Sequence, residues 1–179
     1  KVGVRIEEPV EMAEEFNRYF ASVSTDEDQI NIPQPEMVYK GRKEDEINEV
    51  QISVQDIRHR LQSLRVDKTA GPDEIAPKLL KALSEEVSWP VAHILQKSLD
   101  EGEVPDDWKR SNISPIYKKK GDKGLPQNYR PISLTSQIGK ICESVIKDAI
   151  VLHLEKNRLI NDSQHGFRKG RSCVSNLLE

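Results

Sequence analysis

The chain has 179 residues, of which 36% are hydrophobic and 32% charged, and its net charge is −3. These values are typical of one soluble domain with a modest core. No apolar run approaches the roughly 20 residues that span a bilayer, and the first residues lack the apolar core of a secretory signal, so we expect an intracellular protein of the nucleus or cytoplasm. The two cysteines and four histidines have no spacing that indicates a zinc site.

The net charge hides a strong asymmetry along the chain. Residues 1–108 carry 13 Lys and Arg against 24 Asp and Glu, whereas residues 109–171 carry 14 against 5. A block with a charge of +9 indicates a polyanionic partner. The alternative at this point is a solvated basic face without a partner.

The first 50 residues read as an acidic lead-in with one helix. Apolar residues recur at helical spacing over 9–24, and residues 25–50 are acidic with two prolines, as in a linker. The chain lacks an initiator Met and stops within an apolar-periodic stretch, so we expect it to be cut from a longer protein.

Helical signals dominate residues 51–102. Ser53 with Asp56 three residues later resembles a capping box at a helix start. Gly71-Pro72-Asp73 predicts a turn, and Pro77 fits the first turn of a second helix. A third helix is predicted from about Trp89 to Asp100, ended by the glycine at 102.

The middle of the chain predicts a β-hairpin followed by the longest helix. Strands are expected over 112–117 and 130–134, joined by a basic, glycine-containing loop over 118–128. Pro115 indicates an edge or bent strand. One apolar stripe over 136–156 predicts a helix, with Cys142 on its apolar face as a small buried thiol. The fold class expected is α+β, mostly helical.

Two basic groups are candidates for binding. Lys118 and Lys119 precede the loop glycines and Arg130 begins the returning strand, an arrangement that suits a phosphate chain because lysine is a point charge and arginine a two-pronged donor. The sequence HGFRKGRSC contains Phe167, Arg168, Lys169 and Arg171, which suit a nucleic-acid backbone with one ring for stacking. A solubilising loop and a plain surface turn are the respective alternatives.

Acidic groups do not form a comparable site. Asp106-Asp107 is the only Asp-Asp pair, and it lies at a turn between Pro105 and Trp108, so we interpret it as a helix cap or solvated turn. Glu143 and Asp148 fall within the long predicted helix, where pairing with nearby lysines is expected. No catalytic residue is assigned.

Several motifs in one order resemble a known family. The stretches KTAGPDEIAPKLLK, VPDDWKRSNISPIYKKKGD, NYRPISLTSQIGKICESVI and HLEKNRLINDSQHGFRKGRSC resemble the fingers part of reverse transcriptases from LINE-type (non-LTR) retrotransposons. The resemblance covers about residues 54–179. It implies two parts, namely a linker and lead-in over 1–50 and, over 51–179, the fingers of a right-handed polymerase without palm and thumb.

The resemblance also implies roles for the basic residues. The hairpin would close over an incoming deoxynucleoside triphosphate, gripped by Arg130 and by Lys118 or its neighbour Lys119. The GFRKGRS stretch would place Arg168 and Arg171 near the template strand or the nucleotide pocket. The partners implied are an RNA template, a DNA primer, deoxynucleoside triphosphates, and the rest of the polyprotein, with an endonuclease expected there.

The family's metal-binding aspartates lie in palm motifs that we expect beyond Glu179. The resemblance thus implies Mg²⁺ in the complete enzyme and none bound by these residues, which alone should be inactive. A non-catalytic nucleic-acid-binding module derived from such an element is one alternative. A host enzyme of the same superfamily, telomerase-like or intron-encoded, is another.

Overall fold

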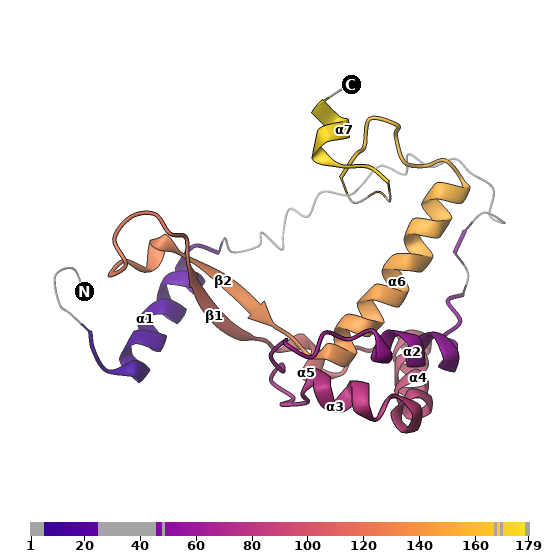
Figure 1. The fold of residues 1–179 in the computed structure, drawn as a ribbon, viewed down its shortest axis with the longest axis horizontal. Coiled ribbons are helices and arrows are strands. Elements are labelled where there is room, and N and C mark those ends of the chain that lie inside the picture. Colours follow the sequence, from indigo (N-terminus) through magenta and orange to yellow (C-terminus); the bar gives the residue numbers. More distant parts are fainter. Residues whose placement is uncertain (1–5, 25–45, 48, 167, 169, 178–179) are drawn as a thin grey trace, which may run out of the picture.

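The computed structural model describes residues 6–24, 46–47, 49–166, 168 and 170–177. Within these residues the fold is mostly helical, with one two-stranded antiparallel sheet. A body of helices occupies one end of the molecule, and the hairpin extends away from it to reach the first helix (Figure 1). The prediction of an α+β, mostly helical chain is confirmed. No described helix is both long and apolar enough to cross a membrane.

The first helix, α1, spans Pro9–Ser22 and confirms the helix predicted over 9–24. The Glu8 side chain accepts hydrogen bonds from the Val10 and Glu11 amides, and Pro9 fits the first turn because its missing N–H has no partner there. No residue of α1 is fully buried. Its stability therefore depends on the surface against which its aromatic face packs.

Four helices form most of the body before the hairpin. They are α2 (Val54–Gln62), α3 (Pro77–Ala82), α4 (Ser84–Glu101) and α5 (Asp106–Lys109). Ser53 caps α2 as predicted, accepting from the Asp56 amide, and Gly102 ends α4 in the left-handed conformation with φ 67°.

The predicted start of α4 at Trp89 is wrong. The helix begins at Ser84 and continues through Pro90. Proline is common in the first turn of a helix, so the sequence pattern places the start beside it. In the structure α4 instead follows α3 after a single residue, Leu83, whose carbonyl accepts from the amides of Glu86 and Val87.

The hairpin joins the body to the longest helix. Strands β1 (Asn112–Tyr117) and β2 (Tyr129–Leu134) are separated by a loop that contains a short 3₁₀ helix, η2 (Pro126–Asn128). Helix α6 (Gln137–Lys156) follows, with the Ser136 hydroxyl accepting from the Gly139 amide at its start. A last short helix, α7, spans Cys173–Leu177. The strands and the long helix confirm the sequence prediction, although β2 starts one residue earlier than expected.

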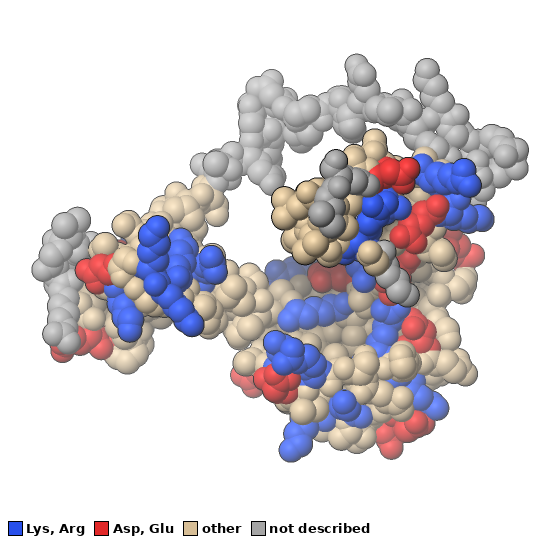
Figure 2. Space-filling model, turned by 45° about the horizontal axis from the view of Figure 1, so that its top comes forward, with Lys and Arg blue, Asp and Glu red and all other residues tan. Residues whose placement is uncertain are grey.

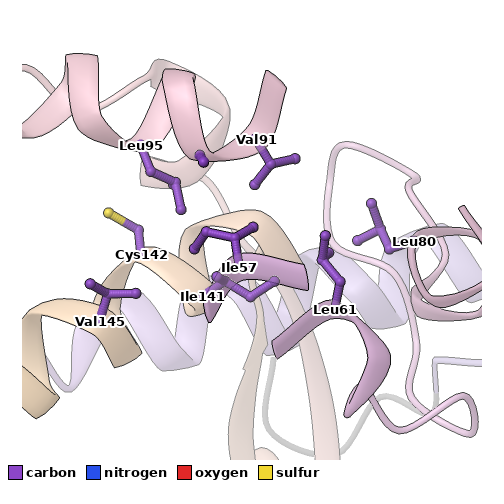
Figure 3. Close-up of a cluster of buried hydrophobic side chains, with 9 residues drawn as sticks. Ile57, Leu61, Leu80, Val91, Leu95, Ile141, Cys142 and Val145 are labelled. Carbon is purple, nitrogen blue, oxygen red and sulfur yellow. The ribbon is translucent and has the colours of Figure 1, made fainter. Parts of the chain in front are cut away.

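The core lies where α2, α3, α4 and α6 meet (Figure 3). Ile57, Leu61 and Leu95 are fully buried, with 0% of their surface exposed. Cys142 is buried beside them, as predicted, and burial raises the pKa of its thiol. These contacts come from four helices, so the core orients the start of α6 and with it the base of the hairpin. The remaining core residues are Leu80, Val91, Ala92, Ile141 and Val145.

Candidate nucleotide and nucleic-acid interface

The pairing of β1 with β2 separates two faces of the hairpin. Tyr117 lies opposite Tyr129, and Ile116 lies opposite Arg130. Side chains alternate between the faces of a strand, and directly paired residues share a face. The two tyrosines therefore lie on one face, and Arg130 lies with Ile116 on the other.

The Arg130 side chain is exposed, and it makes no hydrogen bond or ion pair with any residue that the structure describes. Its neighbours on this face include Ile116 and Ile132, which are 52% and 44% exposed. An arginine without an intramolecular acceptor keeps its two-pronged set of donors available to an anion. The face thus combines an available guanidinium with exposed apolar side chains.

Lys118 continues the ladder beyond β1. Its amide donates to the Asn128 carbonyl at 2.8 Å, so the alternation places its side chain on the face of Arg130. The Lys118 ammonium donates to the Gln127 carbonyl at 2.8 Å. Lys119 has a φ of 59°, where the backbone leaves the strand direction. Of the two candidate lysines, Lys118 is the one that the strand geometry aligns with Arg130.

The loop between the strands is held by bonds that return to its own backbone. The Tyr117 hydroxyl donates to the Gly121 carbonyl at 2.5 Å, and the Tyr129 hydroxyl donates to the Lys123 carbonyl at 2.9 Å. Asn128 donates from its side-chain amide to the Asp122 carbonyl at 2.7 Å. The charged tip is therefore a structured loop, and Lys and Arg side chains gather over this end of the molecule (Figure 2).

The base of the hairpin is fixed to the body at two glycines. A Cβ on Gly71 would lie 2.6 Å from backbone atoms of Thr135 and Ser136, which connect β2 to α6. A Cβ on Gly139 would lie 3.3 Å from the side chain of Trp108, a residue of α5, the helix before the hairpin. The AGPDEI turn therefore packs against the returning end of the hairpin, an approach that only glycine permits at position 71.

The second basic group lies in the segment between α6 and α7. Arg168 donates to the Asn161 carbonyl at 3.3 Å and lies 3.9 Å from the Asp162 carboxylate. Arg171 bonds with His165, which is 5% exposed and also bonds with the Ser175 hydroxyl. Phe167 and Lys169, the other two predicted residues of this group, lie outside the described residues.

The two basic groups do not form one site. The hairpin adjoins the start of α6, and the segment that holds Arg168 follows its end (Figure 1). A helix of this length measures about 30 Å at 1.5 Å per residue. A ligand that contacted both groups would have to be a polymer of several nucleotides.

Arg60 connects two helices of the body through its side chain, and the sequence analysis did not predict this contact. Its guanidinium donates to Asp56 at 2.8 Å, Ser144 at 2.7 Å and Asp148 at 2.9 Å, and so links α2 to α6. Burial acts to lower its pKa, but the bonds with both carboxylates outweigh burial and raise it. Hydrogen bonds from Lys147 and then Arg60 lower the pKa of Asp148. The pairing of Asp148 with a nearby lysine, Lys147, was predicted. For Arg60, the only indication in the sequence is its spacing of four residues from Asp56, which suits an ion pair on one helix.

The acidic pair Asp106-Asp107 lies at the start of a short surface helix. Asp106 and Asp107 begin the short helix α5, and Asp106 pairs with Lys109 at 3.1 Å with 84% of its side chain exposed. Across the described part of the chain, no group of three or more His, Cys, Asp or Glu side chains is placed to hold a metal ion.

Curated proteins from Drosophila melanogaster are similar to this chain. A probable RNA-directed DNA polymerase from transposon BS is 32% identical over 126 residues, which are 70% of this chain and 14% of that protein. A probable RNA-directed DNA polymerase from transposon X-element is 32% identical over 62% of this chain and 12% of its own length. The RNA-directed DNA polymerase from mobile element jockey is 26% identical over 65% of this chain and 13% of its own length.

No protein-family profile matches the chain. The chain spans about one seventh to one eighth of the length of these relatives. Identity of 26–32% over 111–126 residues, found with three relatives of one kind, is consistent with the order of motifs noted above. This chain belongs to the family of RNA-directed DNA polymerases of non-LTR retrotransposons.

Proposed function

We propose that this chain is the fingers part of an RNA-directed DNA polymerase of a non-LTR retrotransposon. In this proposal the hairpin binds the triphosphate of an incoming nucleotide, and the segment around Arg168 and Arg171 binds the template strand. Residues 1–50 form the lead-in, and residues 51–179 form the fingers. The rest of the polyprotein supplies palm, thumb and the carboxylates that hold Mg²⁺. The protein acts inside the cell on an RNA template and a DNA primer.

The open face of the hairpin carries this proposal. The register places Arg130 opposite Ile116, away from the tyrosines, and Lys118 continues on the same face. Charge-assisted bonds from a guanidinium to phosphate oxygens are stronger than neutral ones and fix the geometry of the phosphate chain. The exposed Ile116 and Ile132 offer apolar surface beside the charge, which suits a ligand that is anionic at one end only.

We expect the chain of 179 residues alone to give no templated product in a primer-extension assay. The assay would use an RNA template, a DNA primer, deoxynucleoside triphosphates and Mg²⁺. The reason is the carboxylate geometry described above, because phosphoryl transfer of this kind requires acidic side chains that hold the metal ions. A polymerase extended through the palm is the positive control. Templated extension by the pure chain would contradict the proposal that the catalytic carboxylates lie in the palm and not in this chain.

RNA binding by the chain should weaken steeply with salt. If the basic segments contact about four phosphates of single-stranded RNA, the affinity should fall by about 50-fold between 50 and 200 mM salt. Fluorescence anisotropy with a labelled oligonucleotide measures this slope. Affinity that does not depend on salt would contradict a phosphate-based interface.

Single substitutions then locate the interface. Arg168→Ala should lower the slope of log affinity against log salt by about 0.7, the loss of one phosphate contact. Arg65→Ala is the matched control, because Arg65 is exposed in the acidic part of the chain and pairs with Asp67 at 2.6 Å. An equal effect of both substitutions would contradict the proposed position of the template. Binding of RNA without any binding of nucleotide would favour the non-catalytic module instead.

A further inference from the structure

Helix α1 packs against the far end of the hairpin, although 106 residues separate its last residue from the start of β2. The ring of Phe16 meets the ring of Tyr129 edge-on, with 4.7 Å between their centroids. Phe20 lies behind Phe16 with a centroid distance of 5.8 Å. Figure 1 shows α1 beside this end of the hairpin and away from the helical body.

Tyr129 connects α1 to the charged loop. Its ring lies 5.4 Å from that of Tyr117, its direct partner across the hairpin. Both tyrosine hydroxyls donate to loop carbonyls, at Gly121 and Lys123. The Lys123 ammonium also lies 5.6 Å from the centre of the Tyr117 ring. A displacement of the Tyr129 ring would therefore disturb the anchors of the loop.

The helix covers only one face of the hairpin. Phe16 contacts the tyrosine face, and the alternation of the strands puts Arg130 on the opposite one. Contact with α1 thus leaves the face of Arg130 open. A helix that contacts the tyrosine face and leaves the Arg130 face open can position the hairpin without blocking a ligand.

We propose that α1 positions the charged loop through Phe16 and Tyr129, and that this contact sets the affinity of the hairpin for a nucleoside triphosphate. Phe16 and Tyr129 are then positioning residues, because they act on the loop that adjoins Lys118. The part of this inference that concerns the loop stands on the geometry alone. The part that concerns affinity rests on the proposed function.

The first experiment measures the loop itself in the whole chain. Trypsin cleavage after Lys119, Lys120 and Lys123, followed by mass spectrometry, reports how often the loop opens. Phe16→Ala should increase this cleavage rate about tenfold. Met12→Ala, a change of similar size on the same helix at a 40% exposed position, should leave it within twofold, and Phe16→Tyr should restore protection. Equal cleavage in Phe16→Ala and the wild type would overturn the proposal.

The fluorescence of the two tryptophans controls for unfolding. Trp89 and Trp108 both lie in the body, on α4 and α5, so a thermal melt followed by tryptophan emission reports the body and not α1. The body of Phe16→Ala should melt within about 2 °C of the wild type. A large drop in that melting temperature would overturn a local positioning role, because it would make Phe16 a residue of the core.

The second experiment measures affinity for dATP by calorimetry with the same variants. Phe16→Ala should bind five- to tenfold more weakly, while Met12→Ala and Phe16→Tyr should match the wild type. Loosening of the loop with unchanged affinity would overturn the link to nucleotide binding. If the wild type binds no triphosphate, the proposed function fails, and the cleavage rates still decide whether α1 holds the loop.

Discussion

Replacement of Arg130 by lysine should weaken nucleotide incorporation by about 10- to 150-fold in a polymerase that contains this chain and continues through the palm. The substitution keeps the charge but removes the two-pronged donor. One charge-assisted hydrogen bond contributes roughly 1.5–3 kcal/mol, which corresponds to this range. Single-nucleotide incorporation under single-turnover conditions measures the loss. Arg130→Ala should be worse, since it removes the charge as well.

Folding and RNA binding should stay near wild type in these variants, because the Arg130 side chain is exposed and bonds to no other described residue. Lys123→Ala is the matched control. Lys123 lies in the loop between β1 and β2, and its ammonium lies over the Tyr117 ring, on the tyrosine face. Its effect should be much milder. Normal incorporation by Arg130→Lys, or unfolding of that variant, would make Arg130 a surface or structural arginine and refute the proposed phosphate contact.

Gly71→Ala should destabilise the chain by about 1–3 kcal/mol, and Gly71→Val by more. The added Cβ would lie 2.6 Å from the Ser136 nitrogen and the Thr135 carbonyl carbon, which are backbone atoms and cannot rotate away. Either the AGPDEI turn or the junction between β2 and α6 must then move. For a chain of this size each kcal/mol lowers the melting temperature by about 2–4 °C, which circular dichroism measures.

Gly166→Ala is the control for Gly71→Ala. The nearest atom to a Cβ at position 166 is the amide nitrogen of the Gln164 side chain, at 3.5 Å, which is an ordinary contact with a flexible group. The melting temperature of this variant should change by less than about 2 °C. A Gly71→Ala variant as stable as the wild type would show that the turn does not pack tightly against the hairpin base.

Local patterns predicted most of the secondary structure. The stripe of α6, the cap at Ser53 and the strands on either side of a glycine-containing loop each depend on residues close together in the sequence. The error at α4 has the same origin, because Pro90 is a local signal that the packing of α3 and α4 overrides. Segments with a clear period were therefore predicted, and a boundary beside a proline was not.

The missed features are contacts between distant parts of the chain. Arg60 reaches Ser144 and Asp148, the Gly71 turn reaches Ser136, and Phe16 reaches Tyr129. None of these pairs leaves a periodic trace, since each partner is an ordinary residue for its own element. Contacts between distant segments depend on how the helices pack in the assembled core, so local patterns in a single sequence do not predict them.

Part of the candidate site was also predicted from local sequence patterns. The start of β2 placed Arg130 on the returning strand, and the register then aligned Lys118 with it. The sequence could not show that the Arg168 segment lies at the other end of α6, because the direction of a helix relative to a hairpin depends on Trp108, Gly139 and the core.

The two prolines of the hairpin face each other, Pro115 opposite Pro131, and their position has a consequence for self-association. The Lys118 amide donates to the Asn128 carbonyl, so Lys118 and Asn128 form a hydrogen-bonded pair of the ladder. Hydrogen-bonded and non-hydrogen-bonded pairs alternate along an antiparallel ladder, so Pro115 and Pro131 form a non-hydrogen-bonded pair. The backbone nitrogens of both prolines therefore point outward. Each free edge of the ribbon thus lacks a donor at mid-strand. Neither edge can template an added strand over its full length, so the exposed isoleucines can remain accessible without nucleating aggregation.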